Sequence, residues 1–210
     1  FLRPTSAPCP GPCRCYQNLV DCEHRWLLHV PAMVPHGTWL LDLSGNHLKE
    51  VHSRSFLGLW SLRILLMSNN SLHTLHPQVE KPHLFPLTPL RKLTLLSLRG
   101  NQLTHVKFKT LLKLQTTSTH LHMSSNPWFC DCELQRVFGK IRRVRHLHVD
   151  DYEDVVCHAP AQQTGHTLAS LDTRLCVAET ATVLVITITV LLPTTPRIKA
   201  PETPIVAEGV

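Results

Sequence analysis

The chain has 210 residues, 6% of them aromatic, and a formal net charge of +6 with its 15 histidines counted as neutral. This length suits one domain whose core must be built from leucine, and the positive charge alone would allow nucleic acid as a partner. The sequence carries no nucleic-acid motif and no nucleotide, nucleophile or zinc-histidine fingerprint, so we predict no nucleic-acid partner, no enzyme activity and no cofactor.

The N-terminal region divides into a leader and a cysteine-rich segment. Residues 1–8 contain proline and show no periodicity, so we expect a disordered leader. No apolar stretch opens the chain, and we expect any signal peptide to have been removed or never included. Residues 9–37 carry the spacing C-x3-C-x-C-x6-C. We predict a small disulfide knot there, ending in an edge strand near residues 16–21.

Eight cysteines fall into two clusters of four, one near each end of the chain. Even counts in clusters indicate disulfides and an oxidising compartment, so we expect an extracellular or cell-surface location. Zinc binding is the alternative to disulfides, because four cysteines can hold one zinc ion. Neither cluster has the C-x2-C spacing of structural zinc modules. Spacing alone leaves three pairings open in each cluster. The clusters are Cys9, Cys13, Cys15 and Cys22, and Cys130, Cys132, Cys157 and Cys176.

Residues 38–125 repeat the pattern L-x-L-x-x-N-x-L four times, and the last repeat runs into the segment that follows. Each repeat predicts a short strand with one buried face, which becomes stable only when stacked on its neighbours. The asparagine of each repeat lies where the chain turns inward, and its side-chain amide can form hydrogen bonds with backbone groups of that turn. The third return segment, residues 108–119, leads from one repeat strand to the next and has Ser118 where a leucine is expected. We therefore expect looser core packing in the third and fourth repeats. One alternative is that the chain is a poorly folding variant. The ladder asparagines are Asn46, Asn70, Asn101 and Asn126.

These features resemble the leucine-rich-repeat family, specifically its extracellular branch with cysteine-rich caps at both ends. The resemblance covers residues 9–176. It implies an α/β solenoid: a short curved parallel β-sheet, a convex side that is irregular or made of short helices, and a disulfide cap at each end. It also implies the pairs Cys9–Cys15, Cys13–Cys22, Cys130–Cys157 and Cys132–Cys176. In size and layout the chain is similar to small single-pass subunits of the family, such as the small platelet von Willebrand receptor chains and potassium-channel auxiliary gamma subunits.

Residues 126–176 form the predicted C-terminal cap. Leu134, Val137, Phe138 and Ile141 have helical spacing, which predicts a helix that covers the open end of the core. The opposite face of this helix is basic and is either a solvated surface or a binding site for acidic glycans. The glycan-binding candidates are Lys140, Arg142, Arg143 and Arg145.

The C-terminal region contains an apolar segment, residues 177–199, and a predicted flexible tail, residues 200–210. Residues 181–192 are apolar or threonine throughout, but twelve residues are fewer than the roughly 20 that a membrane-spanning helix needs. A membrane anchor and a β-prone tail therefore remain open alternatives. The protein would accordingly be secreted, or cross the membrane once with its N-terminus outside.

Alternation along the strands predicts a binding surface. If Leu41 and Leu43 face the core, the residues between and beside them line the concave face of the sheet. An apolar strip with a polar rim on this face is typical of a protein-binding site, so we predict an extracellular protein-interaction module whose partner is another extracellular or membrane protein. The predicted partner-binding residues are Leu40, Asp42, Ile64, Leu66, Leu95, Ser97, Arg99, His120 and His122.

Two further features carry chemistry. His120 and His122 lie on one face of the fourth strand, as metal ligands can, but no third ligand is evident and we predict no metal. Protein binding is the first functional hypothesis, and a secreted matrix or glycan binder that uses the basic helix is the second. A metal-dependent hydrolase that uses the two histidines is kept as the third. The single sequon, Asn69-Asn70-Ser71, makes Asn69 a candidate for N-glycosylation.

Overall fold

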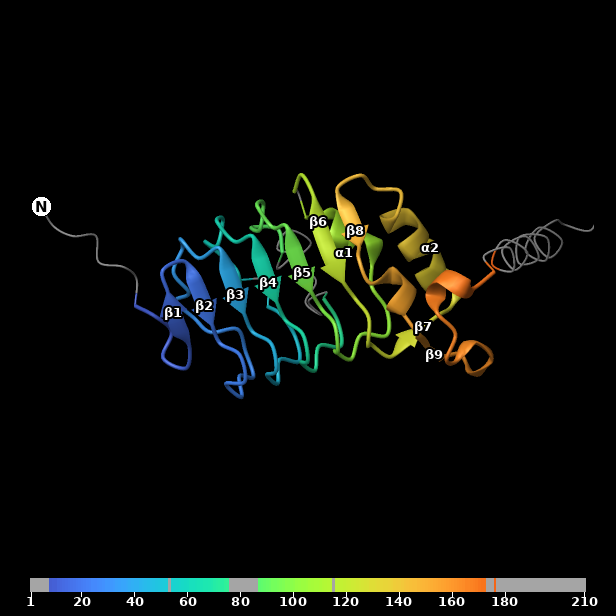
Figure 1. The fold of residues 1–210 in the computed structure, drawn as a ribbon, viewed down its shortest axis with the longest axis horizontal. Helices are drawn as coiled ribbons and strands as arrows, with labels where there is room; N and C mark the ends of the chain where they lie inside the picture. Colours follow the sequence, from blue (N-terminus) through green and yellow to red (C-terminus); the bar gives the residue numbers. More distant parts are fainter. Residues whose placement is uncertain (1–7, 53, 76–86, 115, 173–175, 177–210) are drawn as a thin grey trace, which may run out of the picture. The chain divides into compact units, whose positions relative to one another are not determined.

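The computed structural model describes residues 8–52, 54–75, 87–114, 116–172 and 176. The chain separates into two compact units, Phe1–Leu171 and Asp172–Val210, and the labelled strands and helices all belong to the first unit. Seven strands form one sheet in the order β1-β2-β3-β4-β5-β6-β8 (Figure 1). Their bounds are Arg14–Tyr16 (β1), Leu19–Asp21 (β2), Leu40–Asp42 (β3), Ile64–Leu66 (β4), Leu95–Ser97 (β5), Thr119–His122 (β6) and Leu147–Val149 (β8).

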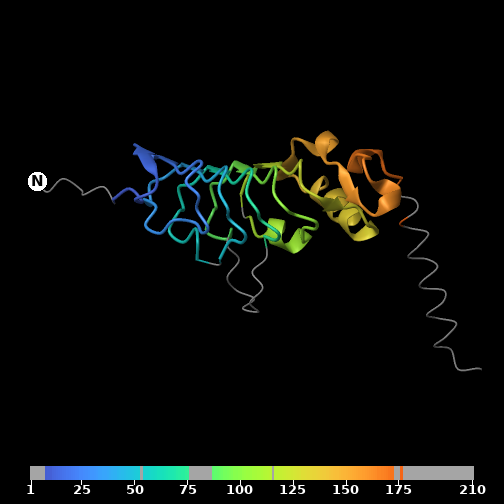
Figure 2. The ribbon, with the colours of Figure 1, turned by 90° about the horizontal axis from the view of Figure 1, so that it is seen from below.

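From β2 onward every strand pair is parallel, as a solenoid of stacked repeats requires. The strands stand in one row, and the return segments lie on the other side of the core (Figure 2). The predicted inward leucines are buried with no exposed area, as Leu41, Leu65 and Leu96 illustrate. Phe56 and Leu62 close the core from the return side of the first repeat and are also fully buried. The predicted fold class is confirmed.

The N-terminal cap differs from the predicted single edge strand. β1 and β2 form an antiparallel hairpin in which Arg14 faces Asp21. The chain reverses at Gln17, whose backbone is left-handed with φ +53°. The prediction of one strand over residues 16–21 was therefore wrong. Because a disulfide joins Cys13 to Cys22 across this hairpin, the two short strands are held together by covalent bonds as well as by backbone hydrogen bonds.

The four ladder asparagines are all buried and bind backbone groups of two successive repeats. In the second repeat, Asn70 Oδ1 accepts from the Leu48 N–H at 3.0 Å. Its Nδ2 donates to the Leu43 carbonyl at 2.9 Å and to the Met67 carbonyl at 3.2 Å. Each amide therefore satisfies a backbone donor and links two repeats. The carbonyls are shared along the ladder, since that of Leu43 also accepts from Asn46 Nδ2 and that of Met67 from Asn101 Nδ2. Equivalent bonds are made by Asn46, Asn101 and Asn126.

Replacing Asn70 by alanine is expected to lower the free energy of unfolding by about 1–3 kcal/mol, because the buried Leu48 N–H would lose its acceptor, Asn70 Oδ1. The measurement is urea unfolding of the full chain followed by circular dichroism. Gln102→Ala is the matched control, since Gln102 also belongs to the ladder region but is exposed. Equal unfolding midpoints for the two variants would contradict a structural role for the ladder.

The third return segment packs more closely than expected. It contains the short helix α1, Phe108–Leu112. Leu111 and Leu114 have no exposed area. Near Ser118, where the repeat lacks its leucine, Thr119 is fully buried and its hydroxyl donates to the Leu93 carbonyl at 2.9 Å. A buried hydrogen bond thus replaces part of the missing apolar contact, and the expectation of looser packing was wrong for the described residues of this repeat.

The C-terminal cap contains the predicted helix, α2, which spans Cys132–Ile141. Asp131 caps it, because its carboxylate accepts from the Leu134 N–H at 2.8 Å. The predicted apolar face is buried, and Phe138 meets the ring of Trp128 edge-on with centroids 5.7 Å apart. The remaining elements are a two-stranded parallel pair, Trp128–Phe129 (β7) with Cys157–Ala159 (β9), and three 3-10 turns at Tyr152–Asp154, Ala161–Gln163 and Leu168–Ser170.

Disulfides join Cys9 to Cys15, Cys13 to Cys22 and Cys130 to Cys157. These are pairs that the family resemblance implies. Cys132 and Cys176 are disulfide-bonded too, and no cysteine in the described ranges is free. The zinc alternative was therefore wrong.

Several sequence predictions fall outside the described residues. These are most of the leader, the apolar segment over residues 177–199 and the tail over residues 200–210. Within the part of the chain that is described, no helix has both the length and the apolar character needed to cross a membrane.

Candidate functional site

The concave face of the sheet brings most of the predicted partner-binding residues into two rows across the strands. In the first row, Leu40, Ile64, Leu95 and His120 are successive partners in strand register. The second row aligns Asp42, Leu66, Ser97 and His122 in the same way. Parallel pairing without a register shift therefore places side chains from four repeats next to one another.

Both rows are longer than the sequence analysis predicted, because the two caps add strands to the sheet. β2 places Leu19 beside Leu40 and Asp21 beside Asp42. At the other end, β8 places His148 beside His120. The cap strands lack the full L-x-L-x-x-N-x-L repeat, which is why they were missed. A usable signal was present in β2, since Leu-Val-Asp at 19–21 matches Leu-Leu-Asp at 40–42.

The middle of the concave face is apolar. Leu40, Ile64, Leu66 and Leu95 are each half-buried, so part of every side chain meets solvent. Because they are adjacent in register, they form one continuous patch, which we call the apolar strip. An apolar patch bordered by polar groups is a surface that a folded protein can cover.

Ser97 does not present a free hydroxyl on this face, which corrects its assignment as a binding residue. It lies in register with Leu66 but only 4% of it is exposed. Its Oγ lies 2.7 Å from the Ser68 Oγ, within the face itself. Arg99, by contrast, is exposed as predicted.

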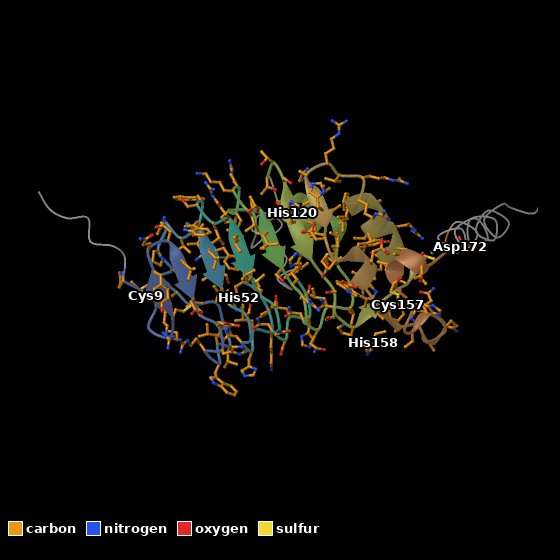
Figure 3. All side chains as sticks on the ribbon, in the orientation of Figure 1. Cys9, His52, His120, Cys157, His158 and Asp172 are labelled. Carbon is orange, nitrogen blue, oxygen red and sulfur yellow. A yellow bond between two sulfur atoms is a disulfide. The ribbon has the colours of Figure 1, made fainter. Side chains whose placement is uncertain are left out.

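Histidines and a carboxylate form one end of the concave face, with His120 visible on β6 (Figure 3). His120 Nδ1 lies 2.9 and 3.0 Å from the two carboxylate oxygens of Asp150. His122 Nε2 is 3.6 Å from the same carboxylate, and the rings of His120 and His148 are 5.2 Å apart. Asp150 follows β8, so sequence reasoning on the repeats alone did not reach it.

This histidine end does not assemble a metal site. Throughout the described ranges, no group of three or more His, Cys, Asp or Glu side chains is placed to hold a metal ion. Asp150 instead orients the imidazoles as hydrogen-bonding groups at the polar rim of the apolar strip. The arrangement offers polar groups that a bound protein could contact.

The basic surface of the C-terminal cap is exposed, as the helical spacing predicted. Lys140, Arg142, Arg143 and Arg145 all meet solvent. Two of them also lie over aromatic rings: the Arg142 guanidinium carbon is 4.7 Å from the ring centroid of Tyr152, and Lys140 Nζ is 5.9 Å from that of Phe108. These cation–π contacts hold both side chains close to the protein surface.

Asn69, the sequon asparagine, is exposed and has a left-handed backbone with φ +52°. Gly45, Gly100 and Ser125 occupy the same place before the other ladder asparagines and share this conformation. A Cβ added to Gly100 would lie only 2.3 Å from Asn69 Oδ1. The missing side chain at Gly100 thus makes room for Asn69, whose glycosylation stays a prediction.

Comparison with known proteins finds leucine-rich-repeat relatives. Leucine-rich repeat-containing protein 3 of Danio rerio is 29% identical over 162 residues, which cover 75% of this chain and 56% of that protein. The Bos taurus protein of the same name is 30% identical over 167 residues, covering 78% of this chain and 60% of that one. Leucine-rich repeats and immunoglobulin-like domains protein 3 of Homo sapiens is 37% identical over 143 residues, or 68% of this chain and 12% of its own length.

The chain thus spans less than two thirds of the length of these relatives. No family model matches it. Among solved structures, a chain from the Toll–Spatzle complex of Drosophila superposes with a TM-score of 0.56 at 24% identity. The match covers 79% of this chain and 21% of the other. At this level of identity the likeness shows the fold alone.

Proposed function

Because this chain is a leucine-rich-repeat protein with a disulfide-bonded cap at each end, we propose that it works outside the cell or at the cell surface. There it binds another protein through the concave face of its sheet. The observation that carries this proposal is the apolar strip, whose members align without a register shift across three strands and remain partly exposed. Covering such a strip removes apolar area from water, which is the main driving force of protein association.

Other observations support the location and the kind of partner. Disulfides are present in both caps, and structural disulfides are typical of proteins from oxidising compartments. Leucine-rich-repeat relatives support a protein-interaction module rather than an enzyme. The structurally similar chain comes from a complex named for two proteins, Toll and Spatzle. These points favour a protein over a small molecule as the occupant of the concave face.

Photocrosslinking on intact cells tests this proposal. The full chain is produced with a photoreactive phenylalanine analogue in place of Leu66 on the concave face. A second version carries the analogue in place of Leu57, which is 63% exposed in the return segment. We expect one or a few defined protein adducts from position 66 and none of these from position 57. The same adducts from both positions would contradict concave-face binding.

A pair of substitutions then measures how much the strip contributes. Leu40→Glu with Leu95→Glu is expected to weaken partner binding at least about tenfold, because central apolar contacts dominate interface energies. The control is Leu57→Glu with Trp60→Glu, which places the same charges on two exposed apolar residues outside the sheet. Unfolding midpoints of all variants separate lost binding from lost folding.

The basic surface at the C-terminal end of α2 supports a second candidate, binding of acidic glycans. Its four cations are exposed; Lys140 lies in the last turn of α2, and Arg142, Arg143 and Arg145 follow the helix. Two of them are engaged with aromatic rings, which leaves fewer free for an extended polyanion. The apolar strip has no such internal partner, and we therefore place the main binding site on the concave face.

A further inference from the structure

A groove of about 580 Å³ lies beside the concave face, at the amino ends of strands β2 to β5. The residues at its wall come just before or at the start of successive strands, so the N-terminal cap and three repeats contribute to one hollow. Those that matter for recognition are Asn18, Gly37, Trp39, Arg63, Ile64 and Lys92.

The groove is positively charged. Arg63 and Lys92 are both exposed. In the described part of the chain neither of them takes part in an ion pair. No acidic side chain is among the residues that line the groove. Two cations without a counter-charge attract a negatively charged group, and the hollow shape concentrates their field.

Backbone groups at the groove wall already have partners. Both the Trp39 and Leu40 N–H groups donate to the Asn18 carbonyl, at 2.8 and 3.4 Å. The Arg63 and Ile64 N–H groups donate to the Trp39 carbonyl, at 2.8 and 2.9 Å. The strand ends therefore offer no open backbone edge for an added strand, and recognition falls to the side chains.

The groove also has an apolar part that continues onto the concave face. Trp39 is 39% exposed, and Ile64 is half-buried. Ile64 belongs to the apolar strip and to the groove at the same time. A protein seated on the strip would therefore extend directly into the groove.

We propose that the groove binds an acidic segment of the protein that occupies the concave face. Carboxylates of that segment pair with Arg63 and Lys92, and an apolar side chain packs on Trp39 and Ile64. The inference rests on the proposed function and adds the chemistry of the partner. Two cations beside an apolar wall match a short peptide of mixed acidic and apolar character.

The test uses the full chain labelled with ¹⁵N and a synthetic acetylated and amidated peptide of sequence Glu-Leu-Glu-Leu-Glu. Trp39 has its own indole N–H signal, which the Trp39→Phe variant assigns. We expect a saturable shift of this signal on titration with the peptide. Arg63→Glu with Lys92→Glu is expected to weaken binding about fivefold to tenfold, the size set by two solvent-exposed ion pairs. Lys49→Glu with Arg54→Glu is the matched control, because both residues are exposed and neither lines the groove.

A steric variant keeps the test independent of charge. A Cβ added to Gly37 would have only Asn18 Oδ1 nearby, at 4.0 Å, and Gly37 does not need a left-handed backbone. Gly37→Leu should therefore fold and fill the groove, with a loss of peptide binding similar to that of the double charge reversal. Gly139→Leu on the exposed side of α2 is its control, since a Cβ there meets nothing within 4 Å.

Three results would overturn the inference. The first is no shift of the Trp39 signal, and the second is equal binding of the peptide Lys-Leu-Lys-Leu-Lys. The third is tighter groove binding by a heparin-derived sulfated disaccharide, which would make the ligand a glycan. Partner binding by the groove variants separates this inference from the proposed function. If Arg63→Glu with Lys92→Glu binds the crosslinked partner normally while Leu40→Glu with Leu95→Glu does not, the groove proposal fails and concave-face binding stands.

Discussion

Replacing Trp128 by alanine is expected to lower the free energy of unfolding by about 3–5 kcal/mol. Trp128 has no exposed area and packs its indole edge-on against Phe138. Its Nε1 also donates to the Met123 carbonyl at 3.0 Å. The substitution would therefore leave a large cavity between the last repeat and the C-terminal cap. It would also remove one of the two side-chain hydrogen bonds that the Met123 carbonyl accepts, the other coming from Asn126 Nδ2 at 2.9 Å.

The measurement is urea unfolding of the full chain by circular dichroism, which does not depend on the fluorescence of the removed indole. Phe129→Ala is the control: the neighbouring ring is 38% exposed and stacks on His105, with ring centroids 5.3 Å apart. Trp128→Phe should fall between the two, because it keeps most of the ring and loses the hydrogen bond. A loss for Trp128→Ala no larger than that for Phe129→Ala would show that the cap is not joined to the core through this residue.

Removing the disulfide between Cys130 and Cys157 has the second large expected effect. Both cysteines are buried, and the bond closes 27 residues. Restricting the unfolded chain by a loop of this length contributes about 3–4 kcal/mol in the chain-entropy model, and we expect Cys130→Ala with Cys157→Ala to lower the free energy of unfolding by about that amount. Cys9→Ala with Cys15→Ala opens a loop of only 6 residues at an exposed position, so the same model gives about 2 kcal/mol.

Hydrogen exchange measures which part of the fold loses stability when this disulfide is removed. The bond fixes β7 against β9, and the Cys130 N–H donates to the Ala159 carbonyl at 2.7 Å. Without the bond, amides of β6 and the fourth repeat should lose protection before those of β3. Earlier loss of protection in the first repeat would contradict the conclusion that the cap stabilises the last repeat.

The repeats were the part of the fold most open to prediction, because their pattern is local. In the L-x-L segments the inward and outward positions follow from strand geometry, and the buried Leu41 and Leu65 agree with it. The helix over residues 132–141 was predictable for the same reason, since its apolar residues recur at helical spacing. Cysteine pairing was open from spacing alone and came from the family resemblance.

The candidate site was predicted only in part. Register placed Leu40, Ile64 and Leu95 side by side, as expected for stacked repeats. Ser97 was assigned to the surface because alternation puts it on the concave face, yet it is only 4% exposed and its Oγ lies 2.7 Å from that of Ser68, which follows β4. Alternation gives the direction of a side chain, whereas its exposure depends on the size of its neighbours in other repeats.

The sequence by itself determined the repeat and its buried ladder asparagines, since the L-x-L-x-x-N-x-L pattern is local. Only the tertiary structure decided that the caps extend the sheet, that Asp150 joins His120, and that Trp39, Arg63 and Lys92 line one groove. These contacts join residues from different repeats or from a repeat and a cap. They depend on where each return segment places the next strand in the sheet. That placement is set by packing across the whole core rather than by any single motif.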